Sequence, residues 1–198
     1  MTTAGKHAAV KPGDNPFRSG CVDALGYRSP TGETLQAIET RVRDAGFRGA
    51  LVGPHGHGKS TLMHHLATLD PPSGADRHDV LQVMPDGSSV GSVKQALASD
   101  ASRLFIDGYD LLPWRLRWAL LRRTQVIITS HRKTRFPTLL QFETTPELLG
   151  QLIEQLSPEV FGRLGHQEIR ALHARHEGNV RNVLRELYDR VAMGEFAP

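Results

Sequence analysis

The sequence predicts an α/β protein with a parallel sheet of about five strands, covered by helices on both faces and followed by a small helical lid. Short apolar runs alternate with segments of helical periodicity up to Phe142, as expected when helices join parallel strands. A glycine-rich stretch separates one of these runs from the helix after it. Beyond Phe142 only helical periodicity remains, which predicts the lid.

The chain is expected to have three regions. Residues 1–16 are rich in Gly, Pro and polar residues without periodicity, which is typical of a disordered tail. Residues 17–143 hold the alternating strands and helices and form the α/β domain. Residues 144–194 form the C-terminal lid, which is too short for us to expect that it folds alone.

The elements begin at Ser29, which with Pro30 forms an N-cap and first-turn pair for a helix that ends before Gly46. The run GALV (49–52) is expected to be a strand that enters the glycine-rich stretch, and a helix follows. Further strands are expected at DVLQVM (79–84), RLFID (103–107), QVIITS (125–130) and TLLQF (138–142). Further helices are expected over 90–99, over 113–123 with Trp114, Trp118 and Leu121 on one side, and over three segments that begin at Thr145, at His166 and after Gly178.

Length and composition exclude several classes of protein. No apolar run in the 198 residues approaches the roughly 18 that a membrane span needs, so we expect no membrane partner. Residues 1–16 lack a signal-peptide core, so we expect nothing to direct export. Cys21 is the only cysteine and cannot form an internal disulfide, which is consistent with a cytoplasmic protein.

The stretch GPHGHGKST (53–61) matches the phosphate-binding pattern GxxxxGK[ST]. Glycines let successive backbone N–H groups point at phosphate oxygens, Lys59 reaches the terminal phosphates, and the Ser60 hydroxyl binds Mg²⁺. The strand before the stretch and the helix after it are the context that the motif requires. The expected contacts to a nucleoside triphosphate are Gly53, Pro54, His55, Gly56, His57, Gly58, Lys59, Ser60 and Thr61.

Two aspartates lie at the end of the predicted strand RLFID: Asp107 is its last residue, and Asp110 follows three positions later. Asp107 is a candidate Mg²⁺ ligand together with Ser60, and the alternative is an aspartate that caps a turn. Many NTPases place a glutamate next, where it polarises the attacking water, but here Gly108 follows. The next carboxylate, Asp110, is therefore the candidate base, and the alternative is a residue that only starts a helix.

Thr129 and Ser130 end the strand QVIITS, and in a parallel sheet ligands lie beyond the carboxyl ends of the strands. These hydroxyls, or His131, are candidates to sense the γ-phosphate. Arg135 follows the same strand and is expected on the nucleotide side, where it would stabilise phosphoryl charge in the site of a neighbouring subunit. The alternative is a surface arginine.

Basic residues are concentrated between Pro113 and Arg135, where seven occur without an acidic residue. The net charge of +3 for the whole chain then leaves −4 for the remainder. A solvated helix face explains this asymmetry, and a nucleic-acid site is the alternative. The seven residues are Arg115, Arg117, Arg122, Arg123, Arg132, Lys133 and Arg135.

These motifs together resemble those of the AAA+ and related P-loop ATPases over nearly the whole chain. GPHGHGKST resembles Walker A, and LFIDGYD resembles Walker B in the D-G-x-D form of the STAND and NACHT branch. VIITSH is similar to the sensor 1 strand, and KTRF (133–136) loosely resembles the arginine-finger box. EGNVRNVL (177–184) is similar to the start of the sensor 2 helix, which implies that Arg181 lies over the phosphates. NPF (15–17) and YRSP (27–30) resemble the base-side segment of secretion-associated and transposon target-capture ATPases, which implies a nucleotide contact for Phe17.

The resemblance implies a Mg²⁺-dependent ATP-binding protein and ATPase, in which nucleotide sets the position of the lid and thereby binding to a protein partner or self-assembly. Gly108 in place of glutamate keeps a slow or non-hydrolysing ATP switch open as the alternative. A small-molecule or nucleotide kinase is disfavoured because the region after Phe142 lacks an arginine-rich lid. TSH (129–131) also resembles the switch histidine of ABC ATPases, but no LSGGQ-like signature accompanies it.

Overall fold

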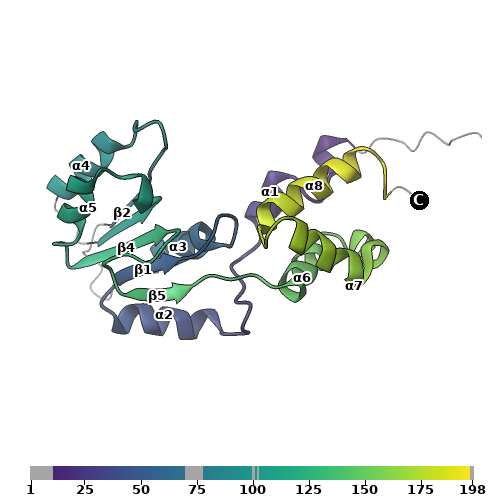
Figure 1. The fold of residues 1–198 in the computed structure, drawn as a ribbon, viewed down its shortest axis with the longest axis horizontal. Helices are drawn as coiled ribbons and strands as arrows, with labels where there is room; N and C mark the ends of the chain where they lie inside the picture. Colours follow the sequence, from purple (N-terminus) through teal and green to yellow (C-terminus); the bar gives the residue numbers. More distant parts are fainter. Residues whose placement is uncertain (1–10, 70–77, 100, 102, 197–198) are drawn as a thin grey trace, which may run out of the picture. The chain divides into compact units, whose positions relative to one another are not determined.

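The computed structural model describes residues 11–69, 78–99, 101 and 103–196. These residues form two compact units, which we describe separately (Figure 1). The sheet unit is Tyr27–Glu143, and the helical unit combines residues 11–26 with residues 144–196. The segment 17–26, expected in the α/β domain, therefore belongs to the helical unit, where Phe17 is buried and Val22 and Leu25 pack against the core.

The sheet has five parallel strands, as predicted. In spatial order they are β2 (His78–Gln82), β3 (Arg103–Asp107), β4 (Gln125–Ser130), β1 (Arg48–Val52) and β5 (Thr138–Gln141). The central strands are buried almost throughout, which explains why their sequences are continuous apolar runs. Strand β4 lies between β1 and β3, so its carboxyl end separates the ends of those two strands.

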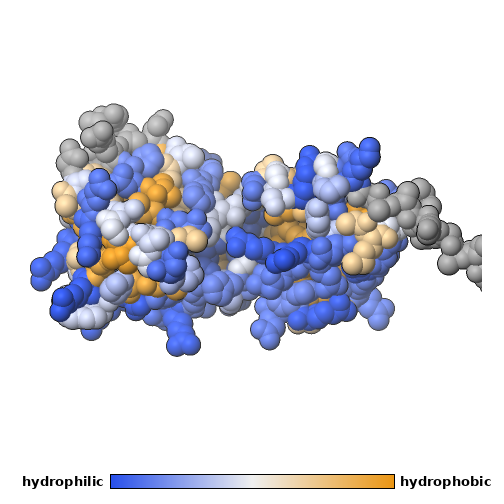
Figure 2. Space-filling view, turned by 90° about the horizontal axis from the view of Figure 1, so that it is seen from above, coloured by the Kyte–Doolittle hydropathy of each residue, from blue (hydrophilic) through white to orange (hydrophobic). Residues whose placement is uncertain are grey.

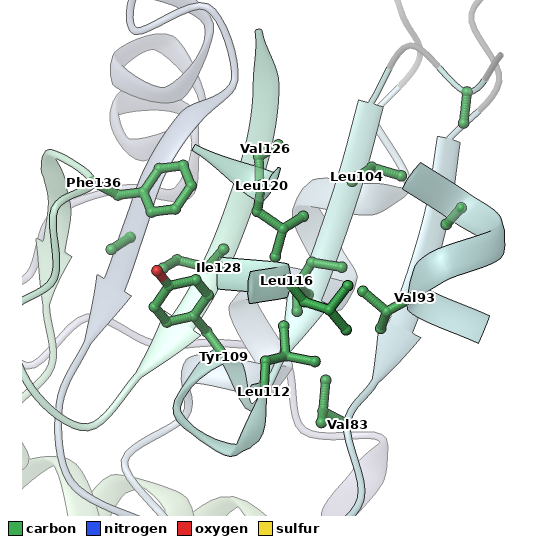
Figure 3. Close-up of a cluster of buried hydrophobic side chains, with 14 of the residues drawn as sticks. Val83, Val93, Leu104, Tyr109, Leu112, Leu116, Leu120, Val126, Ile128 and Phe136 are labelled. Atoms are coloured by element: carbon green, nitrogen blue, oxygen red, sulfur yellow. The ribbon is translucent and has the colours of Figure 1, made fainter. Parts of the chain in front are cut away.

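Helices cover both faces of the sheet, which confirms the predicted layers (Figure 1). On one face, α4 (Val90–Ala98) and α5 (Trp114–Leu120) pack on alternate residues of the strands, including Leu104 and Ile128. Figure 3 shows this cluster, in which Leu116 and Leu120 of α5 lie among strand side chains. On the other face, α2 (Leu35–Asp44) and α3 (Lys59–Ala67) pack on the intervening residues, including Phe105 and Ile127.

Two sequence expectations for the sheet unit need correction. Helix α2 begins after Thr34, whose hydroxyl accepts a hydrogen bond from the Ala37 N–H, whereas Ser29 hydrogen bonds to Thr31 in a turn. Of the three residues expected on the apolar side of the α5 segment, Trp114 and Trp118 are exposed, whereas Leu121 packs against the core. The buried stripe of α5 consists of leucines that include Leu116 and Leu120. In both regions tertiary packing, rather than the local pattern, determines the outcome.

The helical unit contains α1 (Ser19–Asp23), α6 (Pro146–Leu156), α7 (Pro158–Arg175) and α8 (Val180–Ala192). Thr145 caps α6, as its place before Pro146 predicts, and Asn179 caps α8, which begins after Gly178 as expected. The first part of α7, before Gly165, is not predicted from the sequence, although Ser157 and Pro158 form a cap and first-turn pair there. Gly165 (φ 66°, ψ 165°) interrupts α7, which explains why the sequence indicated a helix only from His166.

Residues 11–16 lie within the expected tail, but they are part of the helical unit. The short 3-10 turn η1 (Pro12–Asp14) precedes Asn15, whose Nδ2 donates to the Tyr188 carbonyl at 2.9 Å. Phe17 follows and is buried with Leu149 and Leu187. The rest of the expected tail, residues 1–10, lies outside the described residues. Within the described part of the chain, none of the helices combines the length and apolar character needed to cross a bilayer.

Leu120→Ala tests the packing of α5 on the sheet. Leu120 is fully buried, so we expect the free energy of unfolding of the sheet unit to fall by about 2–5 kcal/mol, through lost contacts and a residual cavity. Urea unfolding followed by tryptophan fluorescence measures this, since Trp114 and Trp118 both lie in α5. The control Leu111→Ala, at an exposed position, should change the value by less than about 0.5 kcal/mol. Equal effects of the two changes would contradict the assignment.

Candidate functional site

The glycine-rich loop, residues 53–58, joins the carboxyl end of β1 to α3. Its first residue is fixed to β4, because the Gly53 N–H donates to the Ser130 carbonyl at 3.0 Å. A Cβ atom at Gly53 would lie 2.6 Å from Cβ of Phe142, so only glycine fits at this point. Gly56 (φ 72°) and Gly58 (φ 88°) have left-handed backbone conformations, which explains why glycine recurs in the loop.

Lys59 is the first residue of α3, and its ammonium group is held against the loop. Its Nζ donates to the carbonyls of Gly53 at 2.6 Å and of Pro54 at 2.5 Å. The side chain is buried, with 7% of the residue exposed, which is unusual for a lysine. His57 is also buried, and its Nδ1 lies 2.8 Å from the His55 carbonyl. A positive charge is therefore fixed in the loop, close to the N-terminus of a helix.

The ends of β3 and β4 are joined through a threonine hydroxyl. Thr129 Oγ1 donates to Asp107 Oδ1 at 2.5 Å and accepts the Gly108 N–H at 2.9 Å. Thr129 is buried, so this pair of hydrogen bonds fixes the orientation of the Asp107 carboxylate. The sequence predicted that Thr129 and Asp107 would lie at the same edge of the sheet, but not that they would contact each other.

Gly108 turns the chain so that Asp110 returns to the end of β4. Gly108 has φ 91°, and a Cβ atom there would lie 3.2 Å from the Val83 carbonyl oxygen. The 3-10 turn η2 (Tyr109–Leu111) follows and carries Asp110. The Ser130 hydroxyl lies 2.9 Å from Asp110 Oδ1, and the His131 N–H donates to Asp110 Oδ2 at 2.6 Å. A glutamate at position 108 would need a backbone conformation that L-residues rarely adopt.

His131 connects Asp110 to the glycine-rich loop. Its Nδ1 lies 3.0 Å from Asp110 Oδ2, and its Nε2 lies 3.1 Å from Nδ1 of His55. The two imidazole rings are 3.7 Å apart between centroids. Since an ionised carboxylate only accepts, Nδ1 of His131 carries a proton, and neutral His131 then accepts at Nε2 from His55.

The surroundings of His131 favour its neutral form. Burial lowers the pKa of His131 below its ordinary value of 6.5, and electrostatic interactions with Lys59 and His55 lower it further. The Asp110 carboxylate opposes these effects but does not outweigh them. At neutral pH the ring is therefore an imidazole with an acceptor nitrogen that faces the loop.

The donor set of this edge suits an anion with many oxygens. The loop carries backbone N–H groups, the Lys59 ammonium and the Ser60 hydroxyl, and it contains no carboxylate. Ser60 and Asp107 supply hydroxyl and carboxylate oxygens, the kind of ligand that Mg²⁺ prefers. Among the described residues no group of three or more His, Cys, Asp or Glu side chains could hold a metal ion.

Neither the family models nor the curated proteins compared with this chain gave a match.

Of the remaining expected site residues, Arg135 is not at this edge. Arg135 lies against α5, with its guanidinium carbon 5.2 Å from the centre of the Trp118 ring. The next residue, Phe136, is buried with Tyr109 and Ile128, so the segment after β4 turns back along the face of the sheet. Phe17 and Arg181 belong to the helical unit, where Phe17 is a core residue and Arg181 is exposed near the start of α8. The nucleotide contacts expected for them remain predictions.

The pairing of His55 with His131 was not predicted from the sequence. The sequence indicates His55 only as a nucleotide contact in the loop, and His131 only as a candidate sensor of the γ-phosphate. Their positions contained a usable signal, because one follows β1 and the other follows β4, and these strands are neighbours in the sheet. Side chains that follow neighbouring parallel strands lie at the same edge.

Gly108→Glu tests the backbone at this turn. We expect the free energy of unfolding of the sheet unit to fall by about 1–2 kcal/mol, because a side chain at positive φ is strained. Urea unfolding followed by tryptophan fluorescence measures the change. In the control Gly91→Ala, on an exposed turn of α4 with nothing within 4 Å of the new methyl, stability should rise by about 0.5–1 kcal/mol. A Gly108→Glu protein as stable as wild type would contradict this account.

Proposed function

We propose that this protein binds ATP with Mg²⁺ in the glycine-rich loop and hydrolyses it slowly. The observation that carries the proposal is the Lys59 ammonium, which is buried and bonded to the carbonyls of Gly53 and Pro54 at the start of the loop. A buried lysine at the N-terminus of a helix, in a loop whose backbone needs glycine, has the form of a phosphate site. The sequence pattern and the backbone geometry support the same interpretation independently.

Each part of the loop has a defined task in this proposal. The N–H groups of the loop and the Lys59 ammonium hold the β- and γ-phosphate oxygens. Ser60 and Asp107 are the ligands proposed for Mg²⁺, which when bound would neutralise charge on the phosphate oxygens. Thr129 keeps the Asp107 carboxylate oriented through their hydrogen bond of 2.5 Å. A Mg²⁺ ion held mainly by phosphate needs no further protein ligand.

In hydrolysis, water attacks the γ-phosphorus, the bond to the bridging oxygen breaks, and ADP and phosphate leave. We infer that His131 accepts a proton through His55, whose Nε2 takes the proton of this water while its Nδ1 gives a proton to His131 Nε2, and that Asp110 positions the His131 ring. Asp110 Oδ2 already accepts the backbone N–H of His131 and lies close to its Nδ1. These contacts favour Asp110 as the residue that positions His131 over Asp110 as the base that contacts water. The lowered pKa of His131 leaves an acceptor nitrogen free of a proton at neutral pH.

A second candidate function is an ATP-dependent switch that does not turn over. The left-handed Gly108 supports it, because the usual glutamate cannot occupy this turn without strain. In a switch, Ser130 and the two histidines would sense the terminal phosphate, and Arg181 and the helical unit would respond. Binding of ATP without phosphate release above background would identify the switch. A protein partner, or a second copy of the chain, would receive the signal in either case.

Lys59→Ala tests the proposed binding site. We expect ATP affinity to fall at least about tenfold, because charge-assisted hydrogen bonds to phosphate are lost. Isothermal titration calorimetry with ATP and Mg²⁺ measures it. Lys94→Ala removes the same charge from an exposed position in α4 and should bind like wild type. No heat with the wild-type protein, or equal heat from Lys59→Ala, would refute ATP binding in the loop.

His131→Asn tests the proton acceptor by its pH profile. In the wild type we expect phosphate release to decrease as pH falls through the His131 pKa, which lies below 6.5, because the protonated ring cannot accept. His131→Asn should lower the rate at neutral pH by about 10²-fold or more and remove this pH dependence. His64→Asn, at an exposed position of α3, is the control. If Asp110→Asn abolished turnover while His131→Asn kept the rate and its profile, Asp110 would be the base.

A further inference from the structure

Helix α5 has two apolar stripes, and only one of them faces the core. Leu116 and Leu120 pack on the sheet together with Leu112, which precedes the helix (Figure 3). Trp114 and Trp118 are four residues apart and share the opposite side, where they are 66% and 50% exposed. They are the only two tryptophans of the chain. Large aromatic rings left in solvent on one helix face indicate a surface that another molecule covers.

Arginine side chains lie directly on these rings. The Arg115 guanidinium carbon is 5.5 Å from the centre of a Trp114 ring, and that of Arg135 is 5.2 Å from Trp118. Figure 2 views the molecule from above, the side on which Figure 1 draws α4 and α5. It shows uncovered apolar side chains among hydrophilic ones over the sheet unit. The contacts of Arg115 and Arg135 with the rings place charge on the aromatic surface itself rather than at a separate rim.

Five cations of the basic stretch are available to a ligand. Arg117 and Arg123 are not among them, because they donate to carbonyls at 2.7 Å and 2.8 Å. The remaining five are exposed, and none forms an ion pair with a carboxylate in the described part of the chain. They are Arg115, Arg122, Arg132, Lys133 and Arg135.

We propose that this α5 surface, formed by Trp114, Trp118, Arg115 and Arg135, binds single-stranded nucleic acid. Unpaired bases would stack on the indole rings, and the phosphates would lie against the guanidinium groups. The proposal does not depend on ATP binding, because it uses none of the residues of the loop.

Charge complementarity favours a nucleic acid over an acidic protein. Protein interfaces are depleted of charge at their centre, whereas here the cations lie on the aromatic rings themselves. A single strand presents the matching arrangement, because a planar base and a phosphate alternate along it. A duplex keeps its bases stacked inside and would meet only the cations.

The test uses the full chain and a fluorescein-labelled oligothymidylate of about 16 nucleotides, a length that suits a site of this kind. We expect anisotropy to rise on binding, intrinsic tryptophan fluorescence to be quenched, and affinity to decrease with added salt. The double variant Trp114→Ala/Trp118→Ala should bind at least about tenfold more weakly, through lost stacking. Arg115→Ala/Arg135→Ala should weaken binding and reduce the salt dependence.

Matched control variants distinguish binding at the α5 surface from the general effect of losing an exposed charge or an exposed apolar side chain. Lys94→Ala/Arg185→Ala removes two exposed charges elsewhere, and Met193→Ala removes an exposed apolar side chain; both should bind like wild type. Circular dichroism of each variant establishes that it is folded. No binding at low salt, binding unchanged in the tryptophan variant, or equal binding and quenching by polyglutamate would each overturn the proposal. A labelled duplex that binds as tightly as the single strand would overturn it as well.

Discussion

The candidate site depends on the parallel pairing of β3, β4 and β1. This pairing brings three strand ends to one edge of the sheet, and each end is then bonded to its neighbour. The Gly53 N–H bonds to the Ser130 carbonyl, and the Thr129 hydroxyl bonds to Asp107. Because β4 lies in the middle, its last residues contact both the glycine-rich loop and the aspartates. The geometry of the edge is therefore set by the whole sheet, with helices packed on both faces, rather than by the loop alone.

Gly108 determines which carboxylate reaches this edge. Its left-handed conformation directs the chain into η2, and Asp110 then bonds to the backbone of His131. A carboxylate that positions an imidazole differs chemically from one that contacts water, because the imidazole can lose and regain a proton near neutral pH. Gly108 stands where the common D-E pattern has a glutamate, and this edge of the sheet instead carries the pair formed by Asp110 and His131. This arrangement supports either slow turnover or a switch, and both use the same edge.

Most strands and the alternation of layers could be predicted from the sequence, because buried parallel strands are continuous apolar runs. Residues such as Asp107 and Thr129 could be placed at one edge by the same argument. The sequence could not decide between the two apolar stripes of α5, since leucines and tryptophans both recur at helical spacing, and only the sheet selects one. The position of Phe17 was also beyond local pattern, because its partners, such as Leu149, are far away in the sequence. Contacts of this kind depend on tertiary packing, which no sequence window contains.

The helical unit is assembled from both sides of the sheet unit in the sequence, and this has a consequence for how the protein is made. The hydrogen bond from Asn15 to the Tyr188 carbonyl joins residues 173 positions apart. During synthesis the ribosome completes the whole sheet segment before the partners of Phe17 exist, so the early segment must wait with its apolar side chains uncovered. Folding of the sheet first would shorten the effective loop that the helical core has to close, and would lower the entropy lost in closing it.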